Sequence, residues 1–101
     1  MVVYNITTKV TWQIADEWLK WQQEEHIPEM LATLLFADHK IFKLLEQDDD
    51  EGPTFTIQFF FSDAEKYEAY IRLHSARLRE KAITRWGNQS ISFRTLMQLV
   101  N

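Results

Sequence analysis

The sequence predicts an α+β domain in which one antiparallel sheet of four strands carries two helices on a single face. Apolar residues alternate with a period of two near 2–10, 54–61 and 90–100, and they recur at helical spacing near 12–31 and 62–86. Only two glycines and two prolines occur among the 101 residues, which is typical of an ordered chain with short connections. We therefore expect a single domain that covers residues 1–101.

The first third of the chain predicts a strand followed by a helix. Residues 2–10 alternate in polarity, as a half-buried strand does. The hydroxyl of Thr11 can cap the helix that follows, which is expected to run to about His26. Because the ring of Pro28 disfavours helical geometry at Ile27, a separate short helix is expected to begin at Pro28.

The rest of the chain predicts a hairpin, a long helix and a last strand. Residues 36–46 form the first arm of the hairpin, with apolar groups on both faces, and an acidic turn leads into 54–61. Ser62 and Glu65 have the spacing of a capping box at the start of a helix that ends at Trp86. The expected buried stripe of this helix is Tyr67, Ile71, His74, Leu78, Ala82 and Trp86.

This order of elements, β-α-β-β-α-β, predicts a ferredoxin-like plait with strand order 4-1-3-2 and both helices on one face of the sheet. Alternation then assigns side chains to the two faces. The residues expected to face the helices are Tyr4, Ile6, Phe55, Ile57, Phe59, Ile91 and Phe93. The residues expected to form one polar patch on the opposite face are Asn5, Thr7, Gln58 and Arg94.

The second strand lies at an edge of this predicted sheet, and it is apolar on both sides. Exposed edges and apolar sheet faces invite pairing with another chain. We therefore expect a homodimer that forms through the sheet face and this edge strand. The polar patch would then lie inside the interface or line a pocket on the sheet.

Composition excludes several classes of site. The chain has no cysteine, so disulfides and thiolate nucleophiles are ruled out, and no metal-binding motif occurs. No metal site and no cofactor are expected. The net charge of −4 and the acidic turn argue against a nucleic-acid partner, although residues 72–85 are rich in arginine. The N-terminus does not have the pattern of a signal peptide and no apolar run could cross a membrane, which favours a cytoplasmic location.

A spaced set of residues resembles a short bacterial family of uncharacterised proteins. The residues that carry this likeness are Tyr4-Asn5, Trp18, Trp21, His26-Ile27-Pro28, Gln58 and Phe93-Arg94-Thr95. The family is similar in fold to the dimeric α+β barrel proteins, which include cofactor-free monooxygenases, haem-degrading enzymes and mutarotases. The resemblance implies this fold and a homodimer but no particular activity. Haem-degrading members of that superfamily use an asparagine, a tryptophan and a histidine. The resemblance implies that Asn5 and His74 would be the asparagine and the histidine here, whereas the tryptophan has no clear counterpart.

Four further side chains have two interpretations each. Trp18 and Trp21 are either anchors between helix and sheet or a stacking wall for a ligand. His26 either makes a structural hydrogen bond that closes a helix or acts as an acid or base. Arg94 either joins a hydrogen-bond network between subunits or clamps an anionic ligand.

The sequence leaves three hypotheses of function open and favours a binding protein over an enzyme. The first is a homodimer that binds a small anionic or aromatic molecule between sheet and helix. The second is a cofactor-free or haem-type monooxygenase that uses Asn5, His26 or His74 with the tryptophans. The third is a dimer with a purely structural or partner-binding role.

Overall fold

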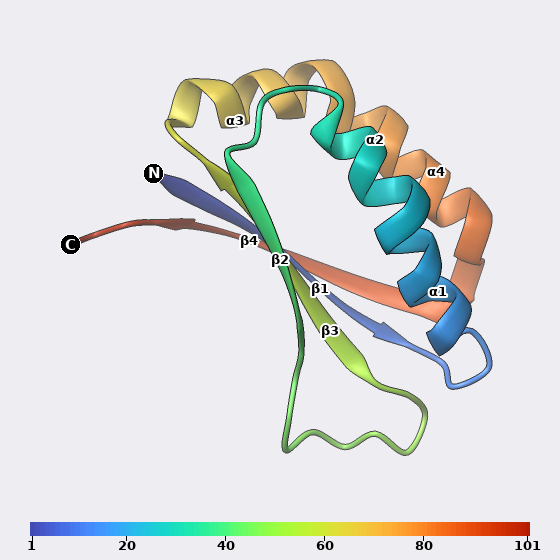
Figure 1. Cartoon of the computed structure of the whole chain (residues 1–101). Coiled ribbons are helices and arrows are strands. Elements are labelled where there is room, and N and C mark those ends of the chain that lie inside the picture. The colour runs from blue at the N-terminus through green and yellow to red at the C-terminus, as the bar shows by residue number, and fades with distance from the viewer.

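The computed structural model describes all 101 residues and has the predicted plait (Figure 1). Its one antiparallel sheet has the strand order β2-β3-β1-β4, which is the predicted order read from the other edge. The strands are β1 (Val2–Val10), β2 (Asp38–Lys43), β3 (Thr54–Phe61) and β4 (Ser90–Gln98). The first helical segment comprises α1 (Ala15–Trp21), η1 (Gln22–His26) and α2 (Ile27–Leu31). The second comprises α3 (Ala64–Tyr70), η2 (Ile71–Ser75) and α4 (Ala76–Trp86), followed by the 3-10 turn η3 (Gly87–Gln89).

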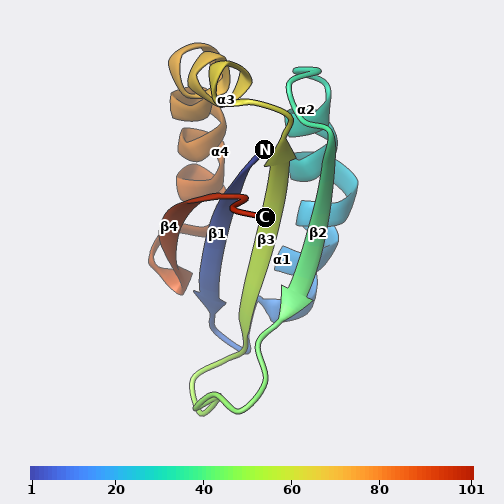
Figure 2. The same ribbon diagram turned by 90° about the vertical axis from the view of Figure 1, so that its left-hand side faces the viewer.

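Both helical segments cover one face of the sheet, and the other face has no layer over it (Figures 1 and 2). The core lies between the helices and the sheet, where Phe59 and Phe61 of β3 are fully buried. We call the uncovered side of the sheet the open face. None of the helices combines the length and the apolar composition needed to span a membrane.

The first helical segment is continuous through Pro28, so the predicted break at Ile27 is wrong. Ile27 has helical angles of φ −61° and ψ −44°. The segment accommodates the proline because η1 is a π-helical turn, in which the Ile27 amide donates to the Gln22 carbonyl five residues earlier. A π turn widens the helix just before the residue whose ring would otherwise crowd the preceding turn.

Two predicted helix caps also differ from the structure. Helix α1 starts at Ala15 without a side-chain cap, and the Thr11 hydroxyl donates to Gln89 instead. Helix α3 is capped by Asp63, whose Oδ1 accepts from the Lys66 amide at 2.9 Å, rather than by Ser62. The carboxylate satisfies the orphan amide as the serine hydroxyl was expected to do.

The buried stripe of the second helical segment is shifted by one residue in its N-terminal half. Tyr70 and Ser75 are buried, whereas Ile71 is exposed and His74 is half-buried. These two buried residues are five apart because η2 is a second π-helical turn. Beyond it, Leu78 and Trp86 are buried as predicted.

The phase of β4 is opposite to the prediction. Arg94 pairs with Ile6, and Phe93 pairs with Thr7. Residues that lie directly opposite one another in antiparallel strands project from the same face. Arg94 therefore belongs to the helix side, while Ile91 and Phe93 lie on the open face with 63% and 67% of their surface exposed.

Candidate functional site

A cavity of about 50 Å³ lies between the helix side of the sheet and the two helical segments. We call it the central cavity. Its walls come from β1, β3 and β4 on the sheet, and from both helical segments, including η1, η2 and α4. One water needs about 10–15 Å³ of such space, so the cavity has room for a few groups of that size.

Three polar side chains that line the central cavity are buried without a hydrogen-bond partner. They are Gln22, His26 and Trp86, with exposed fractions of 6%, 7% and 5%. The atoms without a partner are the Oε1 of Gln22, the Nδ1 of His26 and the Nε1 of Trp86. A buried polar atom without a partner costs about 1–3 kcal/mol, so three around one cavity are unusual in a folded protein.

The π turns place polar residues at this cavity. Gln22 and His26 are the first and last residues of η1, and both are buried. Ser75 is the last residue of η2 and lines the same cavity, where its hydroxyl donates to the Ile71 carbonyl at 3.0 Å. Single π turns within α-helices occur frequently at functional sites. Here both helical segments have one, and each contributes to the cavity wall.

His26 is a neutral imidazole at neutral pH. Burial lowers its pKa from 6.5 to about 4. The nearby charges of Lys81 and Arg94 also lower this pKa, and Glu29 opposes them. The residue lies in the middle of a continuous helix rather than at its end, so the predicted helix-closing hydrogen bond is absent.

The only charged side chains that line the central cavity are two arginines, Arg79 and Arg94. No carboxylate lines it, although the chain has a net charge of −4. Neither arginine forms a salt bridge, since the one salt bridge of the structure joins Lys81 and Glu29. Both arginines are exposed, so they form the rim of the cavity, while Gln22 and His26 form its interior.

Tyr70 lines the same cavity as Arg79 and Arg94, and its side chain is uncharged at neutral pH. Burial raises the pKa of Tyr70 well above its ordinary value, and Tyr4 acts in the same direction. Arg94 and Arg79 act against this shift but do not reverse it. The positive charge at the rim therefore has no negative side chain to neutralise it from within the cavity wall.

Trp18 and Trp21, the two tryptophans with two interpretations each, differ in burial and in their contacts. Trp18 is a buried anchor, 2% exposed, whose ring stacks on Phe55 at 5.3 Å, and it also lines the central cavity. Trp21 is half-buried, stacks on His26 at 4.5 Å and meets Trp86 edge-on at 5.8 Å. Trp21 thus connects the rings of His26 and Trp86, which places these two cavity residues near one another.

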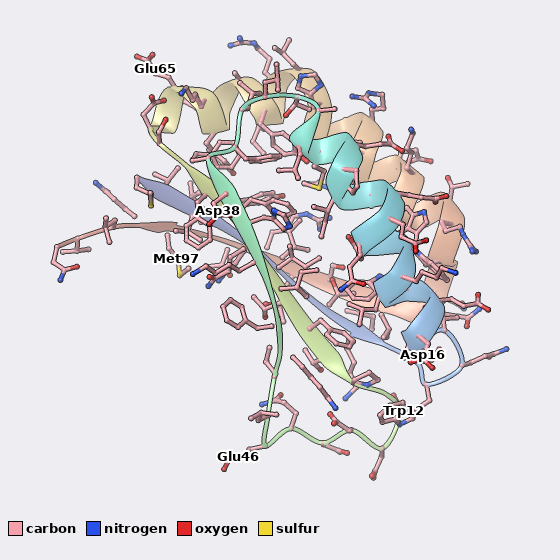
Figure 3. The ribbon with its side chains drawn as sticks, in the orientation of Figure 1. Trp12, Asp16, Asp38, Glu46, Glu65 and Met97 are labelled. Carbon is pink, nitrogen blue, oxygen red and sulfur yellow. The ribbon has the colours of Figure 1, made fainter.

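Three of the four residues of the predicted polar patch come together on the open face. Asn5 pairs with Gln58, and Thr7 donates to or accepts from Thr56 at 3.0 Å. Met97 also lies on this face, away from the helices (Figure 3), and the Asn5 amide contacts its sulfur at 3.8 Å. Arg94 is not part of the patch because it lies on the other side of the sheet.

His74 is half-buried and lies outside the central cavity, so it is not part of the buried stripe that the sequence predicts. It lies in a shallow groove with Glu29 and Arg77, where its Nδ1 is 3.2 Å from an Arg77 nitrogen. The arrangement that the haem-degrading resemblance would require is absent. Asn5 is on the open face and His74 is on the helical layer, so the sheet separates them and they do not form one haem pocket.

Sequence reasoning missed Gln22, Arg79 and Trp86 as cavity residues. A signal for Gln22 is present in the sequence, because it occupies a polar position within the otherwise apolar spacing of Ile14, Trp18 and Met30. Arg79 gave no such signal, because in the sequence an exposed arginine at the rim of a cavity looks the same as any other exposed arginine. Trp86 was expected in the core, but nothing indicated that its indole N–H would lack a partner.

Solved structures of other proteins share this fold at low sequence identity. An ethyl tert-butyl ether d family protein from Bacillus halodurans superposes with a TM-score of 0.73 at 13% identity, over 99% of this chain and 100% of that one. A dimeric ferredoxin-like protein from an uncultured marine organism has a TM-score of 0.69 at 14% identity, over 100% and 96%. SnoaB, a cofactor-independent oxygenase from Streptomyces nogalater, has a TM-score of 0.66 at 14% identity, over 99% and 94%. At these identities the likeness shows the fold alone.

No curated protein sequence matches the chain. The family model described as a domain of unknown function, DUF4286, matches residues 1–100, which is nearly the whole chain. Because this family model covers nearly all of the sequence, the chain belongs to the DUF4286 family.

Proposed function

We propose that this protein binds a small anion in the central cavity. The observation that carries the proposal is the pair of arginines, Arg79 and Arg94, at the rim of a cavity lined by no carboxylate. A guanidinium group binds carboxylates and phosphates through two parallel hydrogen bonds, and neither arginine is engaged in a salt bridge within the chain. The size of the cavity favours a ligand of a few non-hydrogen atoms over a large aromatic molecule.

Titration of the protein with propionate, lactate and phosphate at constant ionic strength tests this proposal. Tryptophan fluorescence is a suitable signal because Trp18 and Trp86 line the cavity. We expect saturable binding of at least one of these anions. Arg94→Gln should weaken it about tenfold or more, because a hydrogen bond to a charged group contributes about 1.5–3 kcal/mol.

Arg72→Gln is the matched control, since Arg72 is exposed and does not line the cavity. It removes the same charge from the chain and should leave the affinity unchanged. Absence of saturable binding for all three anions, or an equal effect of both substitutions, would contradict the proposal. Native mass spectrometry of gently purified protein would complement the titration by revealing any ligand retained from the cell.

We also propose that the protein is a homodimer whose open sheet faces meet. Four large apolar side chains support this arrangement, since each is exposed on or beside the open face: Phe42, Ile91, Phe93 and Met97. Burial of such a patch against a second copy is favourable at roughly 25 cal/mol per Å² of apolar surface. Solved proteins of this fold include two that are described as dimeric. Sedimentation velocity at micromolar concentration tests the assembly.

A monooxygenase is the second candidate, and His26 is the residue that favours it. A neutral imidazole in a mostly buried cavity can accept a proton from a bound substrate. Proteins described as antibiotic biosynthesis monooxygenases share the fold. Oxygen uptake in the presence of a bound organic acid, abolished by His26→Gln, would support this activity. A protein that binds no anion and takes up no oxygen would leave the structural dimer as the remaining hypothesis.

A further inference from the structure

The buried end of the central cavity differs chemically from its rim. The rim has the two cationic side chains, whereas the interior has the three neutral polar groups of Gln22, His26 and Trp86. A simple carboxylate would engage the rim and leave the interior groups without partners. These interior groups therefore favour a ligand with a second, uncharged polar group.

The donors and acceptors of the interior restrict what that second group can be. The indole Nε1 of Trp86 can only donate a hydrogen bond, and the Oε1 of Gln22 can only accept one. The Nδ1 of a neutral His26 can do either, depending on its tautomer. A hydroxyl group satisfies this mixture, because it accepts from the indole and donates to the amide oxygen or the imidazole. A keto oxygen cannot, since it only accepts.

From this arrangement we propose that the ligand is a small hydroxy carboxylate. Its carboxylate binds Arg94 and Arg79 at the rim, and its hydroxyl binds among Gln22, His26 and Trp86. The inference rests on the proposed anion binding and specifies its chemical class. The π turn η1 is the structural device for this selectivity, because it positions both Gln22 and His26 in the cavity wall.

Lactate, propionate and pyruvate form a matched set for the test. All three are three-carbon monocarboxylates, and they differ only in having a hydroxyl, a hydrogen or a keto oxygen at the second carbon. We expect lactate to bind about tenfold or more tightly than propionate, since a group that pairs buried polar atoms avoids a cost of about 1–3 kcal/mol. Pyruvate should bind less tightly than lactate because it leaves the Gln22 oxygen without a donor.

Two variants show whether the interior groups cause this preference. Trp86→Phe removes the indole N–H and keeps an aromatic ring against Trp21, and Gln22→Met removes the amide at similar volume. Each should lower the ratio of lactate affinity to propionate affinity toward one, because the variant no longer pairs with the hydroxyl. Circular dichroism and urea denaturation of each variant show whether it is folded, so a loss of preference can be separated from unfolding.

The outcomes separate this inference from the proposed function. Equal affinities for lactate and propionate would overturn the hydroxy carboxylate and leave anion binding standing, with ordered water as the partner of the interior groups. Lack of binding by all three acids would overturn both. A preference for lactate that survives both substitutions would show that the interior groups do not recognise the hydroxyl, and it would overturn the inference.

Discussion

His26 makes the folded protein sensitive to mildly acidic pH. Its pKa is lowered to about 4 by burial, against about 6.5 in the unfolded chain. Between these values the unfolded state binds more protons than the folded state, so stability falls as the pH falls through 6.5 and the loss levels off below 4. Between pH 7 and pH 5 the free energy of unfolding should decrease by about 2 kcal/mol from this residue.

Urea denaturation at pH 7 and pH 5, followed by circular dichroism, measures this decrease. His26→Gln should remove most of it, because glutamine does not titrate. His74→Gln is the control, since this histidine lies in the shallow groove with Glu29 and Arg77 and does not line the central cavity. The assignment to His26 is wrong if the His26→Gln variant retains the full difference between the two pH values.

At the scale of single elements, the π turns explain why the helices were predicted only in outline. Ile14, Trp18, Gln22, His26 and Met30 recur at intervals of four residues. In an α-helix each such step moves the side chain about 40° around the axis, so five positions would spread over about 160°. The π turn η1 takes up one residue more than an α turn and keeps this set facing the sheet. Periodicity predicts that a helix is present but does not reveal where a turn is widened.

The turn between β2 and β3 is held against the end of β1 by Gly52. A Cβ atom at this position would overlap the Val10 carbonyl oxygen, which belongs to the backbone and cannot turn aside. Gly52→Ala should therefore lower the free energy of unfolding by about 3 kcal/mol, a typical cost of forcing a group into occupied space. Thermal or urea denaturation measures the change.

Gly87 provides the comparison for this substitution. It also has a positive φ, of 57°, but a Cβ atom there would meet nothing within 4 Å. Gly87→Ala should cost only the backbone strain of about 1–2 kcal/mol. Equal losses for the two variants would show that backbone conformation, and not the close approach to Val10, makes Gly52 necessary.

At the scale of the whole molecule, the topology was predictable because it depends on the order and period of the segments. Strand order and the one-sided helical layer followed from that order. The assignment of faces was predictable for β1 and β3, which alternate strictly because one face is buried. It failed for β4, an edge strand whose apolar Ile91 and Phe93 are largely exposed. A phase error of one residue exchanges the two faces of a strand, and it moved Arg94 from the cavity to the open face.

The exposed phenylalanine on β4 gives a direct test of the homodimer. Phe93 is 67% exposed on the open face, and Leu73 is 60% exposed on the helical layer. Phe93→Glu would place a charge in the proposed interface, and in a two-fold dimer each substitution acts twice. We expect the dissociation constant to rise by about a hundredfold or more, as measured by sedimentation equilibrium, with circular dichroism to confirm folding. Leu73→Glu adds the same charge on the other side and should leave the assembly intact. If the Phe93→Glu protein still sediments as a dimer at micromolar concentration, the subunits meet through another surface, and the apolar side chains of the open face would require another partner.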